Sequence, residues 1–128
     1  MKKTIKIFFM FLFFCACNDQ NSFYCDKING TYAVDELIYE QQSYKNQMSA
    51  NILDFSKDKK CKFPRFMLVS ERGYGTWEIE IKNDSPVLQI KTDYLFFSGE
   101  YNMYFNNDYS KLELVSDSVE IYLSKIME

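Results

Sequence analysis

Alternation of apolar and polar residues is the feature of this chain that most constrains its fold. In the run TWEIEIK, Trp77, Ile79 and Ile81 fall on one side of an extended chain, and Glu78 and Glu80 fall on the other. A period of two residues is the pattern of a β-strand with one buried face. We therefore expect a strand here whose tryptophan and isoleucines face a core and whose glutamates face solvent.

The same pattern recurs through the second half of the chain. Further residues expected to face inward are Leu88 and Ile90 in PVLQIK, Tyr101, Met103 and Phe105 in EYNMYF, Leu112 and Leu114 in KLELVS, and Val119, Ile121 and Leu123 in VEIYLS. Turn-forming pairs such as Asn29-Gly30, Asn83-Asp84 and Ser116-Asp117 separate the runs. About eight such strands in a row predict an all-β, antiparallel domain that is either a closed barrel or a sandwich.

The run TYAVDELIYE changes phase along its length. Tyr32 and Val34 share one face, whereas the next apolar residues, Leu37 and Tyr39, belong to the other phase. A phase slip inside a strand predicts a bulge or a sharp bend.

The stretch that follows is ambiguous, because it mixes helical and strand-like spacing. We expect a strand over residues 51–55 with Leu53 and Phe55 inward, and either a short helix or a long loop over residues 40–47.

The N-terminus has the build of a secretory signal peptide. Lys2, Lys3 and Lys6 precede about ten apolar residues, from Ile7 to Ala16, and no acid appears before Asp19. The apolar run is too short to span a membrane, which needs roughly 20 apolar residues in a helix. The alternative is a buried strand or helix of the core.

The end of this run, Phe14-Cys15-Ala16-Cys17, resembles the lipobox of bacterial lipoproteins. The resemblance implies cleavage after Ala16 and lipidation of Cys17, whereas Cys15 leaves with the signal. Phe14 and Cys15 stand where leucine and a small residue are usual, and cleavage by an ordinary signal peptidase is the alternative. The predicted organisation is a signal peptide over residues 1–16, a lipidated tether over 17–27 and a barrel over 28–128. The predicted location is the bacterial cell envelope, at the outer membrane or the periplasmic side.

Removal of residues 1–16 leaves 112 residues, the length of one domain with a modest core. That part carries 12 basic and 18 acidic residues, a net charge near −6, with no basic block. Nucleic-acid binding depends on neutralising phosphates, so nucleic acid is not an expected partner.

Two cysteines remain besides Cys17. Outside the cytoplasm, Cys25 and Cys61 are expected to form a disulfide that closes a loop of about 36 residues. Two buried free thiols or a metal pair are the alternatives. The chain contains no histidine and no obvious ligand spacing, so no metal or other cofactor is expected.

The order of landmarks is similar to that of small lipocalin-like bacterial lipoproteins over residues 28–126. The matching segments are Asn29-Gly30-Thr31-Tyr32, NILDFSKDKKCKFP, Gly75-Thr76-Trp77-Glu78-Ile79, and the closing runs FSGEYNMYF, KLELVS and VEIYLSK. Tyr32 stands where lipocalins have a tryptophan. The resemblance implies an eight-stranded up-and-down barrel, and it implies neither an enzyme activity nor a particular ligand.

The sequence contains few residues that could form a catalytic site. A nucleophilic triad usually needs a histidine base, which is lacking, and no enzyme activity is expected. Glu78, Glu80, Asp93 and Glu100 are the carboxylates considered for a glycosidase-like pair, and the strand pattern places Glu78 and Glu80 in solvent.

Several aromatic residues are candidates for ligand contacts. Trp77 is expected to be a core plug near one barrel end, and a stacking platform in a cavity is the alternative. Tyr94, Phe96 and Phe97 either rim a barrel mouth or form a buried strand.

The function expected from the sequence is binding of a small apolar molecule or lipid by a membrane-anchored barrel. The candidate ligand contacts are Trp77, Tyr101, Met103 and Phe105. The alternative is a filled barrel that binds a protein partner, as an inhibitor, an immunity factor or an accessory subunit.

Overall fold

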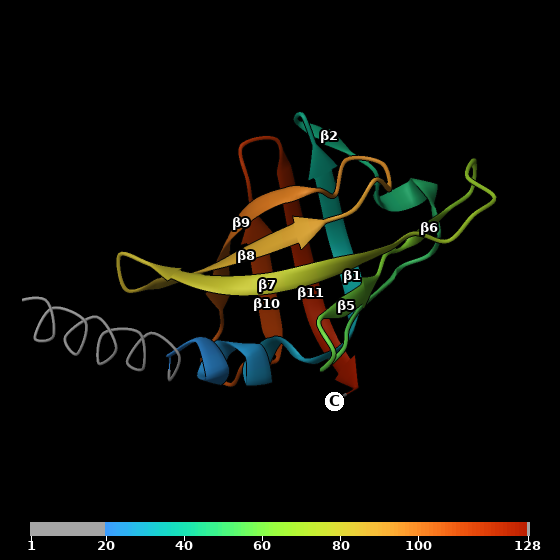
Figure 1. Ribbon diagram of the computed structural model, residues 1–128. Coiled ribbons are helices and arrows are strands. Elements are labelled where there is room, and N and C mark those ends of the chain that lie inside the picture. The colour runs from blue at the N-terminus through green and yellow to red at the C-terminus, as the bar shows by residue number, and fades with distance from the viewer. Residues whose placement is uncertain (1–19, 128) are drawn as a thin grey trace, which may run out of the picture.

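The computed structural model describes residues 20–127, which form a short helix followed by β-strands (Figure 1). The signal peptide and the lipidated Cys17 predicted from the sequence lie outside the described residues. The strands are β1 (Gly30–Tyr39), β2 (Gln42–Ser43), β3 (Met48–Ala50), β4 (Ile52–Phe55), β5 (Lys60–Lys62), β6 (Arg65–Phe66), β7 (Tyr74–Lys82), β8 (Ser85–Lys91), β9 (Gly99–Phe105), β10 (Lys111–Val115) and β11 (Val119–Met127), with a 3₁₀ helix η1 (Lys45–Gln47) between β2 and β3.

Eight of these strands close into a barrel. The strand order is β1, β4, β5, β7, β8, β9, β10 and β11, and β11 pairs again with β1. Every neighbouring pair is antiparallel. The predicted fold class, an all-β up-and-down barrel, is therefore confirmed.

Alternation along the strands fills the barrel. In β7 the side chains of Trp77 and Ile79 are buried, and those of Glu78 and Glu80 are exposed, as the sequence predicted. The largest fully buried side chains are aromatic, and they come from strands and loops all round the barrel: Trp77, Tyr32, Tyr101, Phe55, Phe63 and Phe97. Aromatic side chains bury the most apolar area per residue, so a small barrel with this composition has a packed interior.

Strand β1 carries the predicted irregularity. Its pairing with β11 shifts register between Val34 and Glu36, where the apolar pattern changes phase. A bulge lets a long strand bend, and β1 pairs with β4 through its first residues and with β2 through its last.

The ambiguous stretch after β1 contains a short helix and the expected strand over residues 51–55, together with the short strands β2 and β3. The chain reverses at Glu40 and Gln41, whose positive φ angles of 48° and 69° form a tight turn, and then makes β2 and the single turn η1. The expected strand follows as β4, and Leu53 and Phe55 are fully buried in it.

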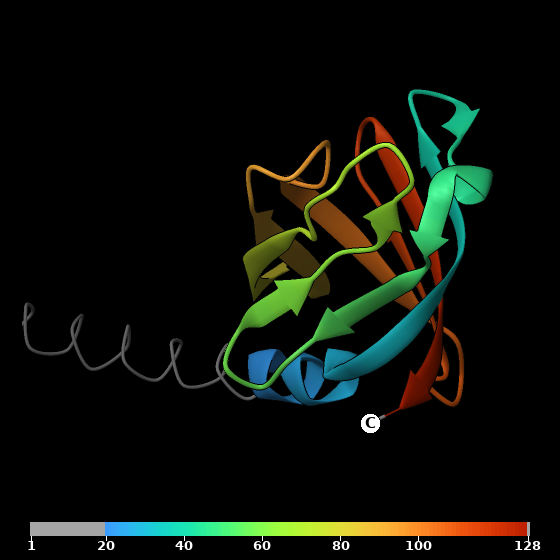
Figure 2. The same cartoon turned by 90° about the vertical axis from the view of Figure 1, so that its right-hand side faces the viewer.

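The helix over residues 20–28 lies across one end of the barrel (Figures 1 and 2). The Tyr24 ring stacks on Phe105 with centroids 6.4 Å apart, and the Tyr32 hydroxyl donates a hydrogen bond of 2.8 Å to the Ile28 carbonyl. Residues 20–27, which the sequence assigned to a tether, are therefore part of the folded body.

The opposite end of the barrel is built from loops. Strands β3 and β6 pair there as a separate ribbon beside η1, and the connections over residues 67–73 and 92–98 lie at the same end (Figure 2).

Candidate functional site

An apolar groove of about 360 Å³ opens at the loop end of the barrel. Its walls come from three segments, namely η1 with its flanks, the loop after β6, and the β8–β9 loop. The lining residues are Tyr44, Gln47, Phe66, Met67, Leu68, Val69, Leu95 and Phe96. Only one of the eight side chains carries an amide, so the groove offers an apolar ligand a nearly continuous apolar wall.

The rim of the groove exposes large apolar side chains to solvent. Leu68 is 94% exposed and Met67 is 62% exposed. Leu95, also exposed, has a φ angle of 51°, a left-handed conformation that a leucine adopts only at an energetic cost. Exposed apolar patches and local backbone strain both occur preferentially at binding sites.

The groove floor rests on an aromatic cluster. Phe96 stacks on Tyr39 with centroids 4.3 Å apart, and Phe97 stacks on Phe63 at 4.6 Å. Offset-stacked pairs of this kind add to the stabilisation from burial alone. The floor is therefore closely packed, whereas Met67, Leu68 and Leu95 at the rim are exposed.

Hydrogen bonds hold the loops that form the walls. The Tyr94 hydroxyl donates to the Pro64 carbonyl over 3.1 Å, and Arg65 Nη2 donates to the Ser70 carbonyl over 3.1 Å. The backbone N–H of Met67 donates to the Gln47 carbonyl over 2.9 Å and ties two walls together. These contacts give the groove a defined shape without a ligand.

Tyr94, Phe96 and Phe97 combine the two roles that the sequence left open. Phe97 is fully buried, whereas Tyr94 and Phe96 are half-buried, and Phe96 lines the groove. Burial raises the pKa of the Tyr94 phenol, and the positive charges of Arg65 and Arg72 oppose that rise.

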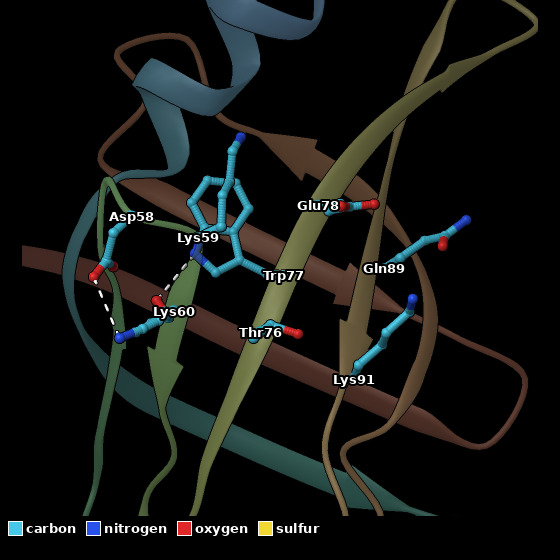
Figure 3. A pocket seen from close by; sticks show the side chains of 8 residues that line it. All are labelled: Asp58, Lys59, Lys60, Thr76, Trp77, Glu78, Gln89 and Lys91. Atoms are coloured by element: carbon cyan, nitrogen blue, oxygen red, sulfur yellow. Dashed lines mark hydrogen bonds and ion pairs between the residues drawn. The ribbon is translucent and has the colours of Figure 1, made fainter.

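Trp77 packs in the core beside Phe55, Lys59 and Lys60, and it is not among the residues that line the groove. Its side chain is 2% exposed, its Nε1 donates to the Lys60 carbonyl over 3.1 Å, and its ring meets Phe55 edge-on. The Lys59 ammonium covers the ring at 4.5 Å from the centroid (Figure 3). These contacts are those of a core residue capped by a lysine.

A smaller hollow of about 280 Å³ lies over Trp77, with lysines among its lining residues (Figure 3). Its lining residues are Asp58, Lys59, Lys60, Thr76, Trp77, Glu78, Gln89 and Lys91. The Lys60 ammonium is 3.9 Å from the Asp58 carboxylate. Several charged side chains border the hollow, and the Lys59 ammonium lies over the tryptophan ring that forms part of its wall.

The other three predicted ligand contacts pack elsewhere. Tyr101 is fully buried and donates a hydrogen bond of 2.7 Å to the Phe97 carbonyl, and burial raises the pKa of its phenol. Met103 is buried, whereas Phe105 packs against the helix through Tyr24. The structure therefore does not bring these residues together with Trp77 around one cavity.

The predicted disulfide is not formed, and both cysteines are free thiols. Cys61 is buried in β5, where desolvation raises the pKa of its thiol to about 12. Cys25 faces a different environment, in which its Sγ lies 3.1 Å from Asn21 Oδ1 and 2.9 Å from Lys59 Nζ. The two sulfur atoms therefore lie in different environments and do not contact each other as a disulfide.

Acidic residues give no catalytic or metal-binding cluster within the described chain. Glu78, Glu80, Asp93 and Glu100 are all exposed, and Lys82 contacts Glu100 at 3.0 Å and Glu80 at 3.9 Å. Residues 20–127 contain no group of three cysteine, aspartate or glutamate side chains placed to bind a metal ion. Over the same residues, no helix has both the length and the apolar character required to cross a bilayer.

Sequence reasoning missed most of the groove. The missed signal was the apolar run Phe66-Met67-Leu68-Val69, which sits between turns and belongs to no alternating pattern. An apolar run outside a strand pattern is a candidate for an exposed contact surface.

Comparison with known proteins gives no match: no family model, no curated protein and no solved structure resembles this chain significantly.

Proposed function

We propose that this protein is a lipid-anchored envelope protein that binds a small apolar molecule or the apolar part of a lipid in the groove at its loop end. The observation that carries the proposal is the groove itself, an apolar hollow of about 360 Å³ with a strongly exposed leucine at its rim. Its volume falls at the lower end of the range of small-molecule sites, roughly 300–1,000 Å³.

Because the interior is packed, we place the proposed binding site at the mouth of the barrel and not in its lumen. The large aromatic side chains fill the lumen, and an eight-stranded barrel is only just wide enough for its own side chains or one small ligand. The site of the proposal therefore differs from the one expected from Trp77, Tyr101, Met103 and Phe105.

Titration with a neutral apolar fluorophore such as N-phenylnaphthylamine tests the groove. Leu68→Ser removes an apolar wall, and we expect it to weaken probe binding by roughly tenfold, because burying a leucine contributes on the order of 1.5–3 kcal/mol. Leu68→Met should retain affinity. Tyr104→Ser, which changes an exposed aromatic residue on the outside of β9, is the matched control and should have no effect.

Equal probe affinity in the Leu68→Ser and Tyr104→Ser variants would contradict binding at the groove. Native mass spectrometry of the intact protein adds a test of occupancy, because a co-purified apolar molecule gives a reproducible extra mass. That extra mass should disappear with Leu68→Ser.

A second candidate function is binding of a protein partner, as the sequence analysis also considered. The packed interior and the exposure of Leu68 and Met67 favour it. A photo-crosslinking residue placed at position 68 in intact cell envelopes distinguishes the two. Crosslinks to one defined protein would support the second function, and crosslinks to small apolar molecules or lipids would support the first.

A further inference from the structure

The two ends of the barrel differ in charge. We define the helix-end surface as residues 20–30, 55–60, 105–111 and 125–127, which Figures 1 and 2 show at the same end. It contains six lysines and three aspartates, a net charge of +3 among the described residues. The corresponding segments at the groove end, residues 39–48, 66–74, 91–99 and 115–119, contain three basic and four acidic residues. With Asp19 and Glu128, which directly adjoin these segments in the sequence, the sum is +1, so the helix end is still more basic than the groove end, at −1, in a mature chain of net charge near −6.

Three of the lysines extend into solvent. Lys57 lies on the β4–β5 turn, Lys60 begins β5 and Lys111 begins β10, and all three are exposed. Of these, Lys60 lies 3.9 Å from the Asp58 carboxylate. Two other lysines of this surface, Lys27 and Lys59, lie over aromatic rings, with Lys27 Nζ 4.8 Å from the Tyr109 ring centroid.

Exposed apolar side chains lie on the same surface. Phe23 on the helix is 44% exposed and Ile126 at the end of β11 is 52% exposed. Lys27 Nζ lies 5.5 Å from the Phe23 ring centroid, so an apolar ring and a positive charge project together. Lysines beside exposed aromatic and aliphatic side chains are the composition of surfaces that lie at a membrane interface.

We propose that the helix-end surface rests on an anionic lipid bilayer. The proposal uses the lipid anchor of the proposed function for its orientation. Two residues lie between Cys17 and residue 20, and the three Cα–Cα steps that join them span at most about 11 Å, so an anchor on Cys17 keeps this end beside the bilayer. Juxtamembrane lysines each contribute about 1 kcal/mol at an anionic surface. The groove then faces away from the membrane that holds the protein.

Vesicle co-sedimentation of the unlipidated mature chain tests the surface independently of the anchor. The chain from residue 17 onward, with Cys17→Ser, contains the helix and every described strand. We expect it to bind vesicles of phosphatidylcholine and phosphatidylglycerol in equal parts more tightly than vesicles of phosphatidylcholine alone. The difference should shrink as salt is added, because salt screens exposed charges.

Two double variants with the same change in charge locate the interaction. Lys57→Gln with Lys111→Gln should weaken binding to the anionic vesicles by roughly 30-fold, at about 1 kcal/mol for each lysine. Lys45→Gln with Arg72→Gln changes the groove end and should leave binding nearly unchanged. Phe23→Ser should reduce the binding that persists at high salt.

Equal binding to both kinds of vesicle, or equal effects of the two double variants, would overturn the proposal. This experiment contains neither a lipid on Cys17 nor a ligand in the groove, so its failure leaves those proposals to their own tests. Conversely, an unlipidated Cys17 or an empty groove would leave the vesicle result unaltered.

Discussion

At the scale of single residues, Trp77 is held by a hydrogen bond, a ring contact and a cation over its face. Its indole nitrogen has a carbonyl partner, its ring meets Phe55 edge-on, and the Lys59 ammonium covers its outer face. The same residue type in an open cavity is a stacking platform, but here the ring has no free face large enough for a ligand.

Trp77→Ala is therefore expected to lower the free energy of unfolding by roughly 3–5 kcal/mol, because it leaves a large cavity in the core. Denaturant unfolding followed by circular dichroism measures the change. Trp77→Phe should cost less, since it keeps part of the ring, and Lys91→Ala on the nearby surface should cost little. An unfolding midpoint unchanged by Trp77→Ala would place this residue outside the core.

Cysteine pairing is the residue-scale expectation that the structure corrects. The expected location outside the cytoplasm and the presence of two leftover cysteines favoured a bond between Cys25 and Cys61, but neither consideration includes the direction in which each side chain points. In the fold, β5 buries the Cys61 sulfur, and the helix holds Cys25 against Asn21 and Lys59. A disulfide requires a specific separation and mutual orientation of the two side chains, which sequence alone does not supply.

At the scale of elements, the long strands were predictable, whereas the short strands β2, β3 and β6 and the loops were not. Alternation identified β7, β9, β10 and β11 with their buried faces, because a period of two residues determines which side chains share a face. The phase slip in β1 likewise located the bulge. The loop after β6 and the β8–β9 loop have no period, so their approach to each other depends on the strands that carry them.

Gly73 shows how closely these loops approach. A Cβ atom at this position would lie 2.1 Å from the Tyr94 ring, so only glycine allows Tyr94 to occupy its place behind the groove wall. We expect Gly73→Ala to displace the ring, to destabilise the protein by about 1–3 kcal/mol and to weaken probe binding in the groove.

A double-mutant cycle checks this cause. Tyr94→Ala removes the ring, and adding Gly73→Ala to that variant should then cost much less than Gly73→Ala alone. Additive effects of the two substitutions would show that the contact between Gly73 and Tyr94 is not responsible.

At the scale of the whole molecule, the two ends of the barrel have different chemistry. The helix-end surface is basic, with apolar side chains among its lysines, and the groove end has exposed aliphatic residues around a slightly acidic rim. With an anchor at Cys17, this polarity would present the groove to the space away from the membrane.

The anchor makes a prediction at this scale. Cys17→Ser should release the processed protein from the membrane fraction, because the lipid chains supply most of the attachment. Cys15→Ser is the matched control and should leave the protein in that fraction, since the lipobox resemblance places Cys15 in the segment expected to be removed as the signal. Fractionation followed by mass spectrometry of the N-terminus provides both measurements. A processed Cys17→Ser variant that stays membrane-bound at high salt would contradict lipid anchoring through this residue.

By itself, the sequence determined the local features of this protein. The period of two residues specified strands and their buried faces, turn residues divided the strands, and about eight strands in succession predicted a closed all-β domain. Each of these inferences depends on residues close together in the chain.

Only the tertiary structure decided what lies at each end of the barrel. Residues 20–28, most of which were expected to be a tether, form a helix that covers one end, and aromatic side chains fill the lumen. At the other end, three segments far apart in the sequence form the groove. The physical reason is that closure of the barrel between β1 and β11 sets which loops meet. A local sequence pattern therefore cannot predict contacts between distant segments that lie together only in the closed barrel.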